Sequence, residues 1–303
     1  MIVVAGEALV DVVASDDGGL VGHPGGGPYN VARTVGRLEQ PVAFLGRLSS
    51  DAFGARLRRQ LEADDVATET VVPTDAPTTL ALAELDASGH ADYRFYAAGT
   101  SAPGLSLDEA TAVLPAQLEM LYVGTLGIVF EPIATTLEQL AGRVGDDTLV
   151  ALDPNCRPAA IDDPVGYRER LGRLLRRADV LKVSDDDLEW LLPGRPPVDA
   201  ARALMGPTAA VALVTLGAEG ALVISGEQVV EVEAPRVEVV DTIGAGDAFM
   251  GAFLAEWRSR GLGRPDIDSR EQLVETTRFA CRVAAITCSR AGANPPRRAE
   301  LDA

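Results

Sequence analysis

Short apolar runs alternate with longer amphipathic segments along most of this chain, and this alternation is the strongest constraint on its fold. The runs typical of buried strands are 2–5, 42–45, 121–124, 149–152, 180–183 and 211–215. Apolar residues recur at helical spacing over 29–38, 53–63, 133–144, 167–178 and 199–205. Such an order predicts an α/β fold: a mainly parallel sheet with helices on both faces, which binds ligands beyond the carboxyl ends of its strands.

Two regions interrupt the alternation. Residues 10–14 with 16–19, and 79–85 with 91–97, read as pairs of strands whose turns fall at Gly18-Gly19 and Ser88-Gly89. We expect them to form a small antiparallel β-sheet lid, inserted at about 9–23 and 78–98 of one domain spanning 1–303. The alternative is a pair of edge hairpins without a role in binding.

Composition and charge exclude several classes of protein. The chain carries 45 acidic and 27 basic residues, a net charge of −18, whereas a nucleic-acid-binding surface needs the opposite sign. We expect no nucleic-acid partner and, because no apolar run reaches about 18 residues, no membrane partner. The N-terminus does not resemble a signal peptide, and the three cysteines form no CxxC pair. These features predict a cytoplasmic protein.

The segment from Gly244 to Asp247 is the most informative for chemistry. A β-type run over 236–240 leads into Gly244-Ala245-Gly246, after which an apolar helix is expected. The first N–H groups of a helix have no internal partners, so they can bind an anion such as a transferring phosphoryl group. Asp247 would lie beside that anion and could take a proton from a substrate hydroxyl as general base. Alternatively, it only caps the helix.

The stretch 241–249, DTIGAGDAF, resembles the C-terminal signature of the ribokinase-like (PfkB) carbohydrate kinases. A second signature of the same family is similar to GGGPYNVA at 25–32. The resemblance implies a ribokinase-like fold, a three-layer Rossmann-like sandwich. It also implies catalysis by Asp247 with Gly244, Ala245 and Gly246. The sugar would bind to Asp11, Gly26, Gly27 and Asn30.

Two further stretches are similar to fructokinases: DPNCRP at 153–158 and KVSDDD at 182–187. They imply that Arg157 meets the ATP phosphates or the substrate, the alternative being a structural salt bridge. Asp187 would support Mg²⁺ through water, because its carboxylate is one methylene shorter than the glutamate of many relatives. The ATP-binding residues that the resemblance implies are Lys182, Ser184, Thr215, Gly217, Gly220 and Cys281.

The tail of the chain resembles the family's monovalent-cation site. The implied K⁺ ligands are the Asp241 side chain and the backbone of Ile243, Cys288, Arg290 and Gly292, although Pro296 replaces a hydroxyl donor common in relatives. Relatives acting on 2-keto-3-deoxygluconate carry an arginine where Ala97 stands, so a neutral sugar is favoured. The family also implies a homodimer formed through the lid.

An ATP-dependent, fructokinase-like sugar kinase is therefore the predicted function. 2-Keto-3-deoxygluconate, ribose and nucleosides remain alternative acceptors, and a non-catalytic sugar or nucleotide sensor is the alternative of another class. A dinucleotide-dependent oxidoreductase is disfavoured because no G-x-G-x-x-G follows the first strand, and no Walker motif occurs. His23 and His90, the only histidines, are expected to have no catalytic role.

Overall fold

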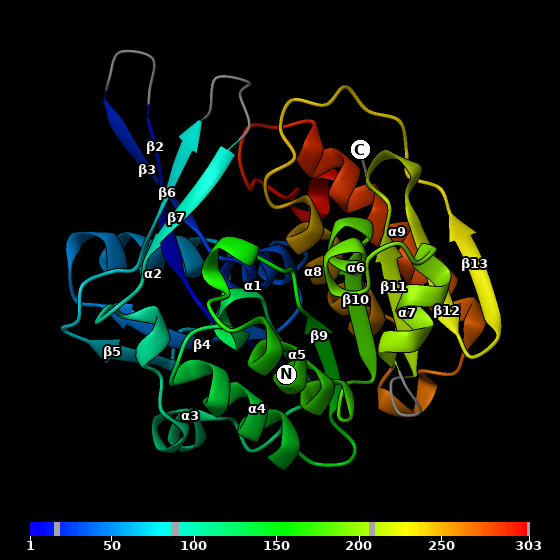
Figure 1. Cartoon of the computed structure of the whole chain (residues 1–303), viewed down its shortest axis with the longest axis horizontal. Coiled ribbons are helices and arrows are strands. Elements are labelled where there is room, and N and C mark those ends of the chain that lie inside the picture. The colour runs from blue at the N-terminus through cyan, green and yellow to red at the C-terminus, as the bar shows by residue number, and fades with distance from the viewer. Residues whose placement is uncertain (15–18, 86–90, 206–209, 302–303) are drawn as a thin grey trace.

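A nine-stranded sheet forms the centre of the molecule in the computed structural model, which describes residues 1–14, 19–85, 91–205 and 210–301 (Figure 1). The strand order is β13-β12-β11-β10-β9-β8-β1-β4-β5, and every pair from β11 to β5 is parallel. An antiparallel hairpin, β12–β13, extends one edge. The strands are β1 (Ile2–Ala5), β4 (Val42–Ser49), β5 (Val71–Thr74), β8 (Met120–Gly124), β9 (Leu149–Asp153), β10 (Val180–Ser184), β11 (Val211–Thr215), β12 (Ala221–Ser225) and β13 (Gln228–Val232).

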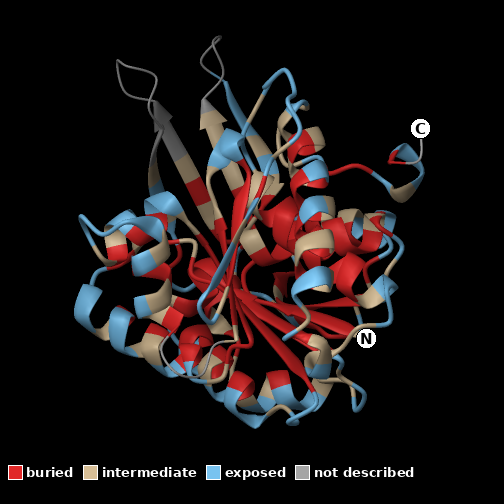
Figure 2. Ribbon diagram, turned by 90° about the vertical axis from the view of Figure 1, so that its right-hand side faces the viewer, coloured by how far each residue is buried: buried red, intermediate tan, exposed pale blue. Residues whose placement is uncertain are grey.

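Helices cover both faces of this sheet, because its strands are apolar on both sides. Ile2 and Val4 of β1 pack in one core, and Val3 and Ala5 pack in the other. The first core is covered by α1 (Gly27–Arg37), α2 (Ala52–Ala63), α8 (Ala245–Ser259) and α9 (Arg270–Cys288). The second is covered by α3 (Leu107–Val113), α4 (Ile133–Arg143), α5 (Pro164–Leu175), α6 (Asp185–Leu191) and α7 (Pro197–Met205). Figure 2 shows the resulting buried centre, and the predicted three layers are confirmed.

A smaller sheet projects from the central one (Figure 1). Its strand order is β3 (Leu20–Gly25), β2 (Leu9–Ala14), β6 (Leu80–Leu85) and β7 (Ala91–Tyr96). The two predicted hairpins are antiparallel, but the strand that pairs with β2 begins at Leu20 and not within the predicted 16–19, of which 16–18 lie outside the described residues. The hairpins join through a parallel pairing of β2 with β6. The predicted turn residues Gly18 and Ser88-Gly89, and also His90, lie outside the described residues.

One sequence prediction about the fold was wrong. Residues 236–240 form no strand, and Val239 and Val240 are 59% and 62% exposed. The β-branched residues suggested a strand, but in the described chain no neighbouring strand pairs with them. Strands β5, β12 and β13 and helices α3, α6 and α9 were not predicted. Among the described residues, six short 3₁₀ turns complete the elements: η1 (Ala102–Gly104), η2 (Thr125–Ile128), η3 (Pro158–Ala160), η4 (Gly217–Glu219), η5 (Arg264–Asp266) and η6 (Arg298–Glu300).

Helices α1 and α8 approach each other closely beneath the small sheet. A Cβ atom on Gly251 of α8 would lie 2.6 Å from Thr34 Cβ and 2.8 Å from the carbonyl oxygen of Val31, both on α1. Only glycine fits such a contact without moving the backbone. The amino-terminal turns of both helices therefore meet at one edge of the sheet. No helix within the described ranges is both long and apolar enough to cross a membrane.

Trp257 anchors the far end of α8 and provides a test of this packing. Its side chain is fully buried, stacks on Phe253 at 5.7 Å and donates from Nε1 to the Gly263 carbonyl oxygen at 3.2 Å. We expect Trp257→Ala to lower the free energy of unfolding by about 3–5 kcal/mol, because it leaves a cavity in the core. Urea unfolding followed by circular dichroism measures this loss.

The matched control is Val165→Ala, on a helix position that is 68% exposed. Its effect on unfolding should stay within about 0.5 kcal/mol. Equal losses in the two variants would contradict the packing described for α8.

Candidate active site

Two cavities meet at the carboxyl ends of the parallel strands. The first, here named the inner cavity, measures about 320 Å³ and lies between the central and small sheets. The second, here named the groove, measures about 960 Å³ and extends along β10 and β11 toward α9. Residues that line both include Arg157, Lys182, Thr242 and Gly246. A ligand in one cavity can therefore touch a ligand in the other.

Asp247 lines the inner cavity beside this junction, in the first turn of α8. The helix begins after Gly244, whose left-handed conformation (φ 76°) turns the chain into it. Asp247 makes no capping bond, so the capping alternative is wrong; instead Asn30 Nδ2 donates to its Oδ2 at 2.9 Å. Burial raises the pKa of Asp247, while the Asn30 hydrogen bond and the charges of Lys182 and Arg157 act in the opposite direction. The site therefore holds a carboxylate with raised proton affinity.

Glu7 organises the other side of the inner cavity. Its carboxylate accepts hydrogen bonds from the N–H groups of Gly27 at 3.1 Å and Gly127 at 2.8 Å, and from the Thr125 hydroxyl. Gly26 is the N-cap of α1, so Glu7 holds the turn that presents Asn30. Burial raises the pKa of Glu7 to about 7, against these hydrogen bonds. No role was predicted for Glu7, since its partners come from two segments far from it in the chain, Gly27 at the start of α1 and the turn that contains Thr125 and Gly127.

The small sheet supplies the outer wall of the inner cavity. Asp11 on β2 faces it, and burial, together with the charge of Asp247, raises the pKa of Asp11 to about 6. Tyr93 and Phe95 on β7 also line it, and their rings stack at 6.2 Å. The only sequence signal for these two rings is their alternation, which places them on one face of a strand. Ala97, the position singled out for its missing arginine, is buried after β7 and does not line the cavity.

Arg157 and Lys182 bring positive charge to the junction. Arg157 donates to the Cys156 carbonyl oxygen at 3.0 Å, and no carboxylate of the described residues lies within ion-pair distance of it. The structural salt bridge considered for Arg157 is therefore not formed. Lys182 Nζ lies 3.0 Å from Asp153 Oδ2, and both side chains are buried. The two cations face the space where the cavities join.

The groove contains the residues expected to bind ATP. Ser184 caps α6, and its N–H and hydroxyl donate to Asp187 Oδ2 at 3.0 and 2.7 Å. The other Asp187 oxygen accepts the Cys156 N–H at 2.6 Å, so both oxygens already have partners. Farther along, the groove is lined by Thr215, Gly217, Gly220 and Cys281. The described residues contain no cluster of three or more acidic, histidine or cysteine side chains arranged to hold a metal.

The expected K⁺ ligands gather where residues 240–243 meet the tail. Asp241 accepts the N–H groups of Ile243 at 3.0 Å and Gly292 at 2.8 Å, and the Cys288 carbonyl oxygen accepts the Asp241 N–H at 3.1 Å. The Arg290 side chain pairs with Glu300. The carboxylate oxygens of Asp241 and the carbonyl oxygen of Cys288 are the kind of ligand that a hard cation prefers. A cation here would share them with the backbone N–H groups.

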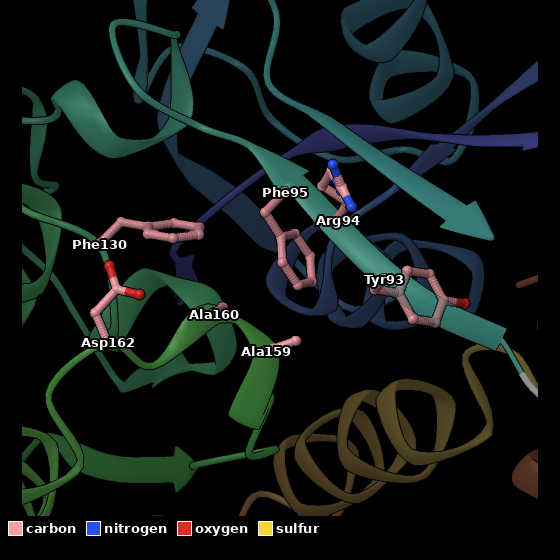
Figure 3. Close-up of a pocket in the computed structure, with 7 residues that line it drawn as sticks. All are labelled: Tyr93, Arg94, Phe95, Phe130, Ala159, Ala160 and Asp162. Atoms are coloured by element: carbon pink, nitrogen blue, oxygen red, sulfur yellow. The ribbon is translucent and has the colours of Figure 1, made fainter.

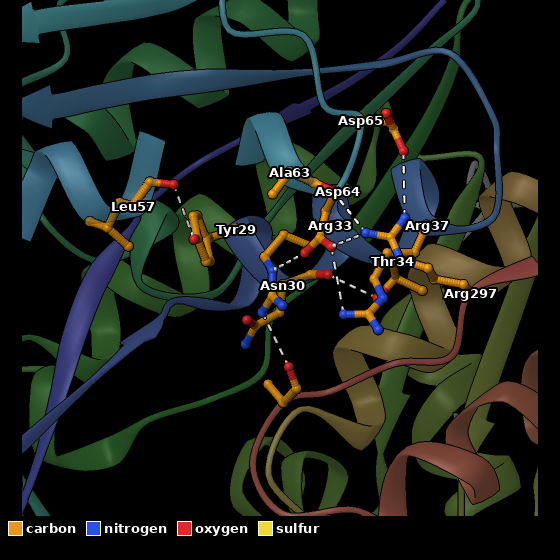
Figure 4. A network of polar contacts seen from close by, with 11 residues as sticks. Tyr29, Asn30, Arg33, Thr34, Arg37, Leu57, Ala63, Asp64, Asp65 and Arg297 are labelled. Atoms are coloured by element: carbon orange, nitrogen blue, oxygen red, sulfur yellow. Dashed lines mark hydrogen bonds and ion pairs between the residues drawn. The ribbon is translucent and has the colours of Figure 1, made fainter. Parts of the chain in front are cut away.

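A buried ionic network fixes the tail against α1 (Figure 4). Arg33 Nε lies 2.8 Å from Asp64 Oδ2, and Arg33 Nη1 donates to the Ala293 carbonyl oxygen at 3.1 Å. Arg37 and Arg297 also pair with Asp64. Because a Cβ atom on Gly244 would lie 2.6 Å from Ala293 Cβ, this network also fixes the turn that begins α8.

A third space, here named the side cavity, adjoins the inner cavity and measures about 340 Å³ (Figure 3). It shares Tyr93 and Phe95 with the inner cavity, and Phe130 stands edge-on to Phe95 at 6.2 Å. The rest of its lining is Arg94, Ala159, Ala160 and Asp162. No residue of this space was predicted as part of a site.

An acceptor-sized cavity joined to a groove at the amino-terminal turn of a helix is the arrangement of a phosphotransferase. The chain belongs to the pfkB family of carbohydrate kinases, whose model matches residues 1–300. It is 35% identical over 270 residues to a fructokinase of Rhizobium leguminosarum bv. trifolii, covering 86% of this chain and 81% of the relative.

Solved structures agree with this assignment. A fructokinase from Xylella fastidiosa with bound ATP superimposes with a TM-score of 0.89 at 28% identity, covering 99% and 97% of the two chains. An aminoimidazole riboside kinase from Salmonella enterica, complexed with aminoimidazole riboside and an ATP analog, gives 0.85 at 26%, covering 96% and 94%. The predictions of a ribokinase-like fold and of an ATP-dependent, fructokinase-like sugar kinase are confirmed.

The Arg33–Asp64 pair generates a stability prediction. Arg33→Met should lower the free energy of unfolding by about 3–5 kcal/mol, because it leaves Asp64 buried without its nearest partner. Arg173→Met removes an exposed pair with Glu138 and should cost about 0–1 kcal/mol. Chemical denaturation of both variants measures the difference. Losses of the same size would show that the Arg33 network is not needed to hold the tail.

Proposed function

We propose that this chain transfers the γ-phosphoryl group of ATP to a hydroxyl of fructose, with Asp247 as the general base. The observation that carries the proposal is the place of Asp247: it lines the inner cavity from the first turn of α8, next to Gly246, which lines both the inner cavity and the groove. Fructose is favoured by the similarity to fructokinases over most of the chain. Ribose and 2-keto-3-deoxygluconate have no comparable support.

The acceptor would bind in the inner cavity among Asp11, Asn30, Gly26 and Gly27. A carboxylate accepts hydrogen bonds from sugar hydroxyls, and an amide both donates and accepts them. Asp247 would take the hydroxyl proton as the oxygen attacks the γ-phosphorus in line. The N–H groups after Gly244 would stabilise the charge that develops on the phosphoryl oxygens.

ATP would bind in the groove, with its adenine toward Cys281 and its phosphates along Gly217, Gly220 and Thr215. Mg²⁺ would enter the groove coordinated by the ATP phosphates and would neutralise part of their charge. Both Asp187 oxygens accept protein N–H or O–H groups, which supports an outer-sphere role for Asp187 through water. K⁺ would bind to the Asp241 side chain and to the backbone carbonyl oxygens of Ile243, Cys288, Arg290 and Gly292.

The small sheet is proposed to act as a lid that excludes water from the acceptor. Leu20, Val21 and Tyr96 expose apolar surface on it, which favours pairing with a second copy of this sheet. The protein would act in the cytoplasm, because its reaction needs ATP.

Asp247→Asn tests the base directly. The amide cannot take the hydroxyl proton, so we expect kcat with fructose to fall by about 10²–10⁴-fold. Calorimetry should detect fructose binding close to that of the unsubstituted chain, because the amide keeps the shape of the side chain. Asp199→Asn, exposed on α7, serves as the control. Turnover near normal in Asp247→Asn would rule out this mechanism.

Ribosides that carry a planar base are a second candidate acceptor class. The side cavity favours them, because Phe95 and Phe130 offer ring faces to a substituent that leaves the inner cavity. The similar aminoimidazole riboside kinase gives independent support.

Filling the side cavity separates the two acceptor classes. Ala160→Trp should lower kcat/KM for such a riboside by at least about tenfold, because the substituent loses its space. The same variant should leave kcat/KM for fructose unchanged, since Ala160 does not line the inner cavity. A coupled ADP assay with both acceptors measures this. An equal loss for fructose and riboside would contradict the assignment of the side cavity.

A further inference from the structure

A buried ion pair lies directly beneath the proposed reaction centre. Leu152 of β9 is opposite Leu181 of β10, so the next residues, Asp153 and Lys182, lie side by side at the ends of adjacent strands. Lys182 Nζ and Asp153 Oδ2 are 3.0 Å apart, and the two side chains are 4% and 0% exposed. Removing two charges from water is costly, and such pairs seldom improve stability over apolar packing. A role in the chemistry would explain why a pair is retained here.

The lysine ammonium group is placed where the inner cavity and the groove join. Lys182 lines both spaces, whereas Asp153 lines neither. A Cβ atom on Gly246 would lie 3.0 Å from Lys182 Nζ, so the ammonium group sits under the first turn of α8. The Ala245 N–H donates to the Thr242 carbonyl oxygen, but the N–H groups of Gly246 and Asp247 have no acceptor in the described chain, and they lie in the same region as the ammonium group. Positive potential is concentrated where a phosphoryl group would cross.

We propose that Asp153 is a positioning residue that holds Lys182 at this junction, where its ammonium group contacts the transferring phosphoryl group and keeps Asp247 ionised. The inference rests on the proposed function, and it assigns Asp153 a role that the sequence analysis did not. Both Asp153 oxygens and the nearby Tyr122 Oη are buried, and apart from the ion pair with Lys182 the described chain gives none of these three atoms a hydrogen-bond partner. The lysine is thus the partner that orients this carboxylate, and the carboxylate orients the lysine.

The reaction balances without proton transfer from Lys182. The acceptor O–H proton passes to Asp247, and the oxygen electron pair forms the new bond to the γ-phosphorus. The bond from the γ-phosphorus to the bridging oxygen breaks, and ADP leaves with that electron pair. Burial opposes the charge on Lys182, but the carboxylates of Asp153 and Asp187 raise its pKa. The ammonium group therefore stays protonated and acts as a fixed charge.

The charges around Asp247 make its pKa a test of this inference. The polar and titratable groups that act on Asp247 or feel its charge are Asn30 on α1, Asp11 on β2, Tyr122 on β8, Asp153 on β9, Arg157 before η3 and Lys182 on β10. Loss of the Lys182 charge should raise the pKa of Asp247. Loss of Asp153 should raise it too, but by less, because Lys182 is then no longer held beside Asp247 while the disappearance of the Asp153 charge acts in the opposite direction.

The experiment compares Lys182→Met and Asp153→Asn by the pH dependence of kcat with fructose and ATP. Both substitutions should lower kcat by at least about 100-fold, because the phosphoryl group loses a placed cation. The acidic limb of the profile should move to higher pH in both variants, and less far in Asp153→Asn. Calorimetric fructose binding should persist in both. If Lys182→Met does not fold, Lys182→Arg, which keeps a displaced charge, should show reduced kcat with the limb unmoved.

Asp179→Asn is the matched control, because Asp179 is also buried and paired with arginines but lies at the opposite end of β10. It should lower stability and leave the acidic limb in place. The inference is overturned if the limb stays in place in Lys182→Met, if it stays in place or moves to lower pH in Asp153→Asn, or if kcat stays near normal in both variants. That result, together with an inactive Asp247→Asn, would leave the proposed base intact and reject only the role of the ion pair.

Discussion

The hydrogen bond between Asn30 and Asp247 is the contact on which the site depends. It joins residues 217 positions apart in the chain and fixes the amino-terminal turns of α1 and α8 against each other. The helices can approach because Gly251 leaves room for Thr34 and Val31. Glu7 secures the turn before α1, and the Arg33–Asp64 network secures the tail against the turn before α8. The first turn of α8, the Asp247 carboxylate and the inner cavity thus come to one point of the sheet.

The charges at the junction of the inner cavity and the groove determine which ligands and reactions it can support. Glu7, Asp11 and Asp247 are carboxylates with raised pKa, and burial is the main cause in each case. Lys182 and Arg157 supply the nearby positive charge, together with the N–H groups at the start of α8. An acidic protein can therefore bind polyphosphate, because backbone dipoles and a few placed cations act locally whereas net charge does not.

Much of this arrangement could be predicted from the sequence. Apolar runs identified the parallel strands, and the glycines before Asp247 indicated the start of a helix that binds an anion. The valines within 236–240 led to the wrong prediction of a strand, because β-branched residues also occur in exposed irregular segments. The role of Glu7 could not be predicted, since its donors converge only in the folded chain. The same holds for the Arg33 network and for the rings of the side cavity, which depend on contacts between distant segments.

Phosphorus NMR of the reaction of this chain with ATP and fructose tests the central claim most directly. Transfer across the junction of the two cavities predicts one fructose monophosphate for each ADP formed, with little inorganic phosphate, because the enclosed acceptor excludes water. ADP appearing with inorganic phosphate instead of a sugar phosphate, or ATP remaining unchanged, would contradict the account.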